Sequence, residues 1–139
     1  MVRPLTYALS LKQPWAGLLV GGRKVVEIRT WATNLRGTIY IHAARSADDR
    51  LEAWARVPAE LRPLCQRHGG IVGRAELIAC IPYHTSAAFE ADAGRHLNPP
   101  EWYVAARTYG FEFRTPAVVP FAPYRGSTRF FTVELTESE

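Results

Sequence analysis

The residues best suited to chemistry stand close together in the stretch GGRKVVEIRTW, at positions 21–31. Lys24 follows two glycines at the expected mouth of a strand, so its amine can reach into any cleft that this turn lines. Glu27 and Arg29 are two residues apart and therefore project from one face of that strand, close enough to pair. Trp31 continues the same face. A lysine, a carboxylate, an arginine and an aromatic edge on one surface suit a phosphate and a stacked base.

The same side chains are open to two other interpretations. In an enzyme, Glu27 is a general base while Lys24 or Arg29 stabilises developing charge. In a structural interpretation, Glu27 and Arg29 simply pair within a sheet and Lys24 is solvated. Three upstream residues, where an expected strand meets an expected helix, are candidates for the edge of the same site: Lys12, Gln13 and Trp15.

Further candidates lie farther along the chain. His42, on the opposite parity to Ile41 in an expected strand, is either a general base facing the cleft or a structural histidine. Arg125, in the last connection, either contacts phosphate or is an exposed turn residue. Phe130 and Phe131 are expected to pack in the core rather than to form a stacking platform.

Charge is distributed unevenly along the chain, which has a formal net charge of +4 and a sequence pI of about 9.4. Residues 1–45 hold seven of the 17 Lys and Arg residues but only one of the 13 acids. A local positive field attracts phosphate and gains from counterion release. The basic N-terminal third therefore indicates an anionic partner, nucleic acid first, or else a solvated surface without a partner.

Composition and simple motifs exclude several classes of protein. With 139 residues and 47% hydrophobic content, the chain is expected to form one domain over 1–139 with a real core. It has no apolar run that could span a bilayer and no secretory leader pattern, so we expect a cytoplasmic location and no membrane partner. Cys65 and Cys80 show no CxxC spacing, and the histidines are scattered. We therefore expect buried thiols and no metal, and the lack of a GxGxxG or Walker A loop predicts no nucleotide cofactor.

The hydrophobic pattern predicts five or six strands interrupted by two helical inserts. Strands are expected over 7–11, 25–31, 38–43, 71–81, 109–116 and 129–135. Gly73 marks a bulge or a close backbone approach within the longest apolar strand. A compact α+β domain built on a small curled sheet or barrel, with helices packed against it, fits this pattern.

The helical segments are predicted from caps and breakers. A short helix follows Pro14 and ends at two glycines, and a second begins near Ser46, with acids in its first turn. Pro58 separates that helix from a further helical piece over 59–67. Residues 82–108 are expected to form a short helix and an insertion loop, and 120–126 a connection before the last strand.

Several segments of the chain resemble ASCH domains (activating signal cointegrator homology), which belong to the PUA-like superfamily. The matching segments are ALSLKQPWAGLLVGGRKVVEIRTW at 8–31, RGTIYIHAAR at 36–45, GGIVGRAELIAC at 69–80, and YGFEF and PFAPYRGSTRFFTVEL near the end. The G-x-K-x-x-E-x-R signature of the family falls on Gly22, Lys24, Glu27 and Arg29. The resemblance covers nearly the whole chain and is weakest over 82–108.

This resemblance implies a PUA-like fold, a small β-barrel or curled mixed sheet with helices against it and a cleft beside the first helix. Members of the family look like RNA-binding or RNA-processing modules. Carried over residue by residue, Lys24, Glu27 and Arg29 line the cleft, with Gln13 and Trp15 at its edge. The leading hypothesis is therefore a small RNA-binding module that takes RNA or a modified nucleoside.

One related branch of the family implies an alternative function. It hydrolyses the amide of N4-acetylated cytidine and looks to rely on a Lys, a Thr and a Glu. Lys24 matches that Lys, Glu27 occupies the Thr position, and Glu90 is the only guess for the third residue. The alternative hypothesis is an amidohydrolase or ribonuclease with Lys24 and Glu27 at its centre, and a protein-interaction domain is a third option.

Overall fold

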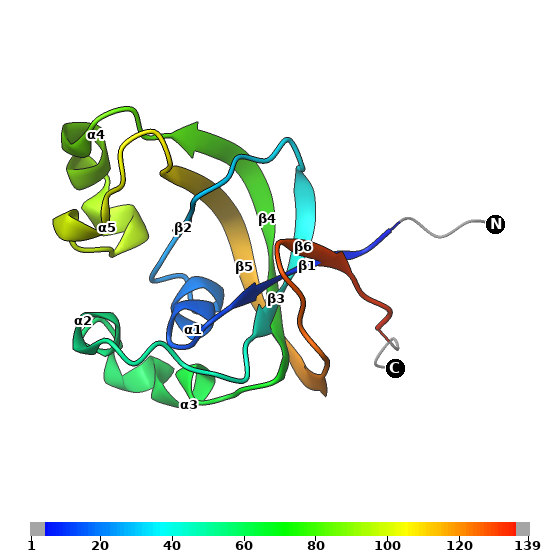
Figure 1. The fold of residues 1–139 in the computed structure, drawn as a ribbon. Coiled ribbons are helices and arrows are strands. Elements are labelled where there is room, and N and C mark those ends of the chain that lie inside the picture. Colours follow the sequence, from blue (N-terminus) through cyan, green and yellow to red (C-terminus); the bar gives the residue numbers. More distant parts are fainter. Residues whose placement is uncertain (1–4, 136–139) are drawn as a thin grey trace.

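A six-stranded mixed sheet forms the body of the protein in a computed structural model that describes residues 5–135. The strand order is β2-β5-β4-β3-β1-β6, in which β1 runs parallel to β3 and every other neighbouring pair is antiparallel. The strands are β1 (Tyr7–Leu11), β2 (Val26–Arg29), β3 (Gly37–Ala43), β4 (Gly70–Pro82), β5 (Tyr109–Pro123) and β6 (Phe130–Thr132). The sheet curls strongly (Figure 1), which confirms the expected α+β class and the curled sheet.

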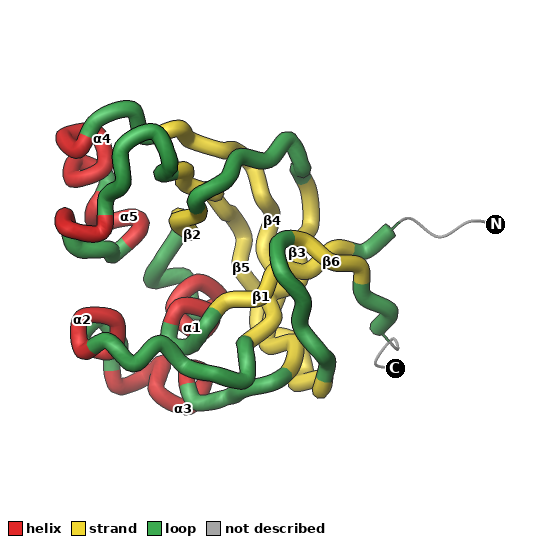
Figure 2. Tube along the Cα trace, in the orientation of Figure 1, coloured by secondary structure: helices red, strands yellow, loops and turns green. Residues whose placement is uncertain are grey.

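Short helices gather on one side of this curled sheet, opposite the side where the two ends of the chain emerge (Figures 1 and 2). They are α1 (Trp15–Val20), α2 (Leu51–Trp54), η1 (Ala59–Leu61), α3 (Arg62–Cys65), α4 (Ser86–Ala91), α5 (Ala93–His96) and η2 (Pro100–Trp102). None of the helices formed by residues 5–135 is long and apolar enough to cross a membrane.

The first helix is the centre of the core. All six residues of α1 are buried, and they pack with residues of β1, β3, β4 and β5. Gly73 of β4 makes this contact possible, since a Cβ atom there would lie 2.4 Å from Cγ1 of Val20 and 2.7 Å from the carbonyl oxygen of Ala117. The close backbone approach expected at Gly73 is confirmed, and the strand register also shifts beside it.

The fifth strand is longer than the sequence predicts. Its expected end at Pro116, and the expected connection over 120–126, are wrong, because β5 continues to Pro123. Strand β2 pairs with β5 only over 109–112, whereas β4 accompanies it to its end. Proline has no N–H to donate, and it is tolerated in a strand whose outer edge faces no neighbour.

Two helical predictions also need correction. The helix expected from Ser46 begins only at Leu51, because Asp48 is held in a turn in which its carboxylate accepts hydrogen bonds from the backbone N–H and the side chain of Arg50. In the segment 82–108, one short helix was expected, and three short helical elements are present, α4, α5 and η2.

Candidate functional site

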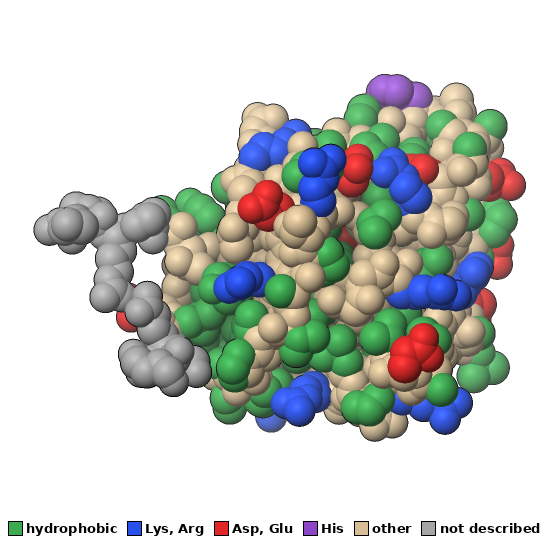
Figure 3. Space-filling model, turned by 180° about the vertical axis from the view of Figure 1, so that it is seen from behind, with side chains coloured by type: hydrophobic (Ala, Val, Ile, Leu, Met, Phe, Trp, Pro, Cys, Tyr) green, Lys and Arg blue, Asp and Glu red, His purple; other side chains and the backbone are tan. Residues whose placement is uncertain are grey.

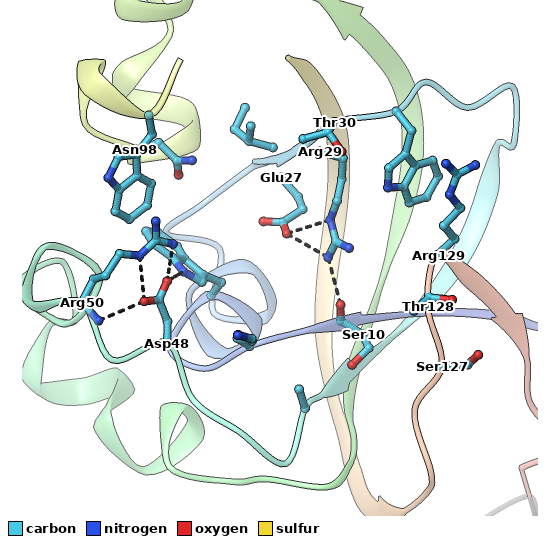
Figure 4. Close-up of a pocket in the computed structure, with 16 residues that line it drawn as sticks. Ser10, Glu27, Arg29, Thr30, Asp48, Arg50, Asn98, Ser127, Thr128 and Arg129 are labelled. Atoms are coloured by element: carbon cyan, nitrogen blue, oxygen red, sulfur yellow. Dashed lines mark hydrogen bonds and ion pairs between the residues drawn. The ribbon is translucent and has the colours of Figure 1, made fainter. Parts of the chain in front are cut away.

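A hollow of about 700 Å³, which we call the main hollow, opens beside α1 and β2. Its walls come from β1, α1, β2, the segments after β3 and α5, η2 and the segment before β6 (Figure 4). The charged and aromatic residues that line it are Lys12, Arg29, Arg50, Arg129, Glu27, Asp48, Trp15, Trp31 and Trp102. Four cations against two carboxylates make it a positively charged surface.

The ion pair of Glu27 and Arg29 lies in the middle of the main hollow. Arg29 Nη2 is 3.0 Å from Glu27 Oε2, as the spacing on β2 predicts. The same Nη2 donates a 2.9 Å hydrogen bond to the carbonyl oxygen of Ser10 on β1. Arg29 therefore bridges β2 to a strand that does not pair with it, and the labelled sticks in Figure 4 show this bridge.

Lys24 lies behind this pair and is only 1% exposed. Its Nζ donates to the carbonyl oxygen of His96, lies 3.6 Å from Glu27 Oε1, and sits 4.7 Å from the centre of the Trp15 ring. Burial lowers the pKa of Lys24 from 10.5 to about 8, while the Glu27 carboxylate opposes that shift. Lys24 is not among the lining residues, and its amine meets the main hollow through the lining residues that it contacts, Glu27, Trp15 and Asn98.

Of the residues predicted for the edge of the cleft, Lys12 and Trp15 line the main hollow and Gln13 does not. The Gln13 side chain is fully buried. Its Nε2 donates to the carbonyl oxygens of Leu64 and Arg67, and its Oε1 accepts from the backbone N–H of Gly17. In this structure Gln13 ties the start of α1 to the end of α3.

His42 and Glu90 also lie outside the main hollow. His42 is 1% exposed, and its ring nitrogens lie 2.8 Å from Ser10 Oγ and 2.7 Å from the carbonyl oxygen of Tyr124. The imidazole thus joins β1 and β3 to the segment after β5, as a structural histidine does. Glu90 is exposed on α4.

Arg125 belongs to a different place on the surface. It lines a second hollow of about 590 Å³, which we call the side hollow, together with Arg45, His68, Gly69 and Tyr124. The structure therefore brings Lys12, Trp15, Glu27 and Arg29 together around one hollow.

Several residues that line the main hollow could not be predicted from the sequence, because they come from segments that lie far apart in the chain. Arg50 Cζ lies 3.5 Å from the centre of the Trp102 ring, and Arg129 Cζ lies 4.9 Å from that of Trp31. Trp102 stands in the segment that the sequence left least defined. The only local signal was the pattern Asp-Asp-Arg at 48–50, which suggests acids paired with a base.

Asp48 fixes one side of the main hollow. Its Oδ2 accepts hydrogen bonds from Trp15 Nε1 at 2.8 Å and from Arg50 Nη2 at 2.7 Å. These contacts, with the Arg50 side chain as the largest cause, hold the pKa of Asp48 well below its usual range. Asp48 therefore stays ionised at neutral pH and orients Arg50 over Trp102.

Comparisons with known proteins agree with this fold. The family model for the ASCH domain matches residues 9–127, and a search of curated proteins gives no match. The crystal structure of ASCH from Zymomonas mobilis is similar, with a TM-score of 0.66 and 14% sequence identity, over 93% of this chain and 87% of that chain.

Crystal structures of two mutants of that Zymomonas mobilis protein are similar to the same degree. Their TM-scores are 0.65 and 0.66, each at 14% identity, over 93% of this chain and 88% and 90% of theirs. At 14% sequence identity, the similarity to these crystal structures shows only a shared fold. The family model, in contrast, matches most of the sequence. The chain belongs to the ASCH domain family, which is PUA-like and generally RNA-binding.

Proposed function

We propose that the main hollow binds single-stranded RNA, with a base inside it and phosphates on its cationic rim. The observation that carries this proposal is the pair of arginine–tryptophan stacks, Arg50 on Trp102 and Arg129 on Trp31, within one hollow. Aromatic rings and guanidinium planes are the surfaces on which unpaired bases stack. A guanidinium that rests on a ring also keeps N–H donors at its edge for phosphate oxygens.

The floor of the main hollow adds a polar contact for the base. Arg29 engages one oxygen of the Glu27 carboxylate, Oε2, at 3.0 Å, while Oε1 lies 3.6 Å from Lys24 Nζ. A carboxylate held in this way can still accept a hydrogen bond from an exocyclic amino group of a base. Lys12, exposed on the rim, supplies a mobile positive charge for a phosphate.

A salt titration of RNA affinity tests this proposal. The probe is a fluorescein-labelled trinucleotide of RNA, followed by fluorescence anisotropy, with the double variant Lys12→Gln, Arg129→Gln compared with wild type. Each phosphate contact makes the slope of log K against log salt steeper by about 0.7 for single strands. Loss of two contacts in the double variant should therefore make the slope less steep by about 1.4.

The control for this titration is Arg74→Gln, an exposed arginine on β4 that lines neither hollow. It should keep the wild-type slope. A double variant that binds the trinucleotide as wild type does, at every salt concentration, would overturn the proposal.

One observation favours hydrolysis as a second candidate function. A lysine amine with a pKa of about 8 lies 3.6 Å from Glu27, whose side chain lines the main hollow. A carboxylate in that position can activate water beside a bound nucleoside. The test is release of acetate from N4-acetylcytidine, and cleavage of RNA, by wild type and Glu27→Gln. Turnover that Glu27→Gln retains in full would exclude Glu27 as the base.

A further inference from the structure

The side hollow is a basic surface that the proposed function does not yet use. Arg45, His68 and Arg125 line it together with Gly69 and Tyr124, and no acidic residue is among them. Arg45, His68 and Arg125 are all exposed. A hollow with donors and without carboxylates suits an anion more than any other class of ligand.

Hydrogen bonds connect the three backbone segments that carry Arg45, His68 and Arg125. The N–H of Gly69 donates to the carbonyl oxygen of Ala43 at 2.8 Å, and the N–H of Tyr124 donates to that of Gly69 at 3.1 Å. His68 Nδ1 also lies 3.3 Å from the carbonyl oxygen of Ala44. Arg45, His68 and Arg125 therefore stand on neighbouring backbone segments that hydrogen bonds connect, rather than on independent loops.

The two arginines of the side hollow differ from most arginines around the main hollow. Arg29 and Arg50 are each paired with a carboxylate. Among residues 5–135, no ion pair within 4.0 Å includes Arg45 or Arg125. Their charge is thus free to meet an incoming phosphate without first breaking an internal contact.

Residues that are neighbours in the sequence line the two hollows at two places in the chain. Ala44 lines the main hollow and the next residue, Arg45, lines the side hollow. Arg125 lines the side hollow, whereas Ser127, two residues later, lines the main one. The same two stretches of chain therefore contribute residues to both hollows.

The face of the molecule behind the view of Figure 1 also carries cationic side chains (Figure 3). Some of these Lys and Arg side chains lie next to Asp and Glu side chains, and others stand apart on hydrophobic and uncharged surface. The side hollow differs from this arrangement, because no acidic residue lines it.

We propose that the side hollow holds the backbone phosphates of the RNA strand whose base occupies the main hollow. This inference rests on the proposed function and narrows it, because it makes the ligand a strand of several nucleotides rather than a free nucleoside. Arg45 and Arg125 contact phosphodiester oxygens, and the contact adds affinity without base preference.

The experiment compares two lengths of RNA on the same protein. A labelled trinucleotide fills the main hollow alone, and a labelled oligo-U of twelve nucleotides also reaches the side hollow. In Arg45→Gln, Arg125→Gln the trinucleotide should bind as it does to wild type. For the twelve-nucleotide RNA, this variant should reduce the steepness of log K against log salt by about 1.4. Between 50 and 200 mM salt, the affinity of wild type should therefore fall by a factor about sevenfold larger than the affinity of the variant does.

The remaining outcomes separate this inference from the proposed function. If Lys12→Gln, Arg129→Gln weakens both RNAs while Arg45→Gln, Arg125→Gln leaves the longer one unchanged, the side hollow is not on the path and only this inference fails. Equal weakening of both lengths by the side-hollow variant also overturns it. If wild type binds neither RNA, both proposals fail. Arg125→Glu, a charge reversal at one exposed residue, is a second variant that should lower the slope for the longer RNA alone.

Discussion

At the scale of single residues, the protein keeps a lysine charged in its interior by placing one carboxylate next to it. Lys24 is 1% exposed, and its amine contacts the His96 carbonyl oxygen, Asn98 Oδ1, Glu27 and the face of Trp15. Burial lowers the pKa of Lys24 to about 8, and Glu27 is the main influence in the opposite direction. Glu27 therefore favours the protonated form of the amine.

Replacement of Glu27 by Gln should lower the pKa of Lys24 below about 8, because the largest opposing influence is lost. It should also reduce the free energy of unfolding at pH 7 by about 2 kcal/mol, since a buried cation loses its partner. The chain contains only two lysines, Lys12 and Lys24. Lysine-selective NMR during a pH titration measures the pKa, and urea denaturation measures the stability.

The control for this variant is Glu76→Gln, which changes an exposed glutamate on β4. It should leave the Lys24 titration where it is in wild type. An unchanged Lys24 titration in Glu27→Gln would show that burial acts alone and that the ion pair is unimportant.

The sequence predicted those site residues that share one strand or its flanks. Glu27 and Arg29 follow from the period of two, and Lys12 and Trp15 from their position where an expected strand meets an expected helix. It failed to show that Gln13 is buried, because an amide next to a helix start looks the same whether it meets solvent or the end of α3. Arg50, Trp102 and Arg129 come together only through the tertiary fold.

At the scale of elements, the packing of α1 against the sheet depends on one glycine, Gly73. A Cβ at Gly73 would lie 2.4 Å and 2.5 Å from the two Cγ atoms of Val20 and 2.7 Å from a backbone oxygen of β5. The helix or the strand would have to move, although α1 and the first four residues of β4 are buried. Gly73→Ala should reduce the free energy of unfolding by about 2 kcal/mol, measured by urea denaturation.

Gly94→Ala is the matched control for Gly73→Ala. Gly94 lies in α5, and nothing lies within 4 Å of a Cβ built there. Alanine is favoured over glycine inside a helix, so this variant should be as stable as wild type or more stable by about 0.5 kcal/mol. Equal stability of the two variants would mean that the helix accommodates the extra methyl group without loss.

Element boundaries were predictable where a hydrophobic period extends over several residues, as in β3 and β4. They were not predictable over 82–108, because α4, α5 and η2 have six residues or fewer and show no usable period. Tertiary contacts hold them instead. Phe89 stacks on His96 with ring centres 4.1 Å apart, and Tyr83 donates a hydrogen bond to Asp92. Strand β5 continues through its prolines for a comparable reason, since its pairing with β4 outweighs local signals.

At the scale of the whole molecule, the curled sheet and the other helices surround α1 (Figure 1), and the main hollow opens beside α1 and β2 (Figure 4). The amine of Lys24 lies behind that opening and is buried. Because unfolding ends this burial, the protonation of Lys24 is coupled to the folding of the whole protein. Unfolding exposes the amine to water and returns its pKa to about 10.5.

Stability should therefore depend on pH through Lys24. At pH values between about 8 and 10.5, the unfolded chain keeps a proton that the folded protein has lost, so stability rises with pH. From pH 8 to 9 the rise from this group is about 1 kcal/mol. Burial raises the pKa of Cys65 to about 11 and also raises the pKa of Tyr83, and these groups act in the opposite direction at higher pH.

Comparison with Lys24→Met isolates this contribution, because the other titrating groups are common to both proteins. The free energy of unfolding, measured in urea at pH 7, 8 and 9, should increase for wild type relative to Lys24→Met by about 1 kcal/mol between pH 8 and 9. Lys12→Met removes the other, exposed lysine and should follow the wild-type curve. A constant difference between wild type and Lys24→Met over this pH range would show that the buried amine does not lose its proton there. Lys24 would then remain a cation behind the main hollow, and the main hollow would be more positive at pH 9 than a Lys24 pKa of about 8 implies.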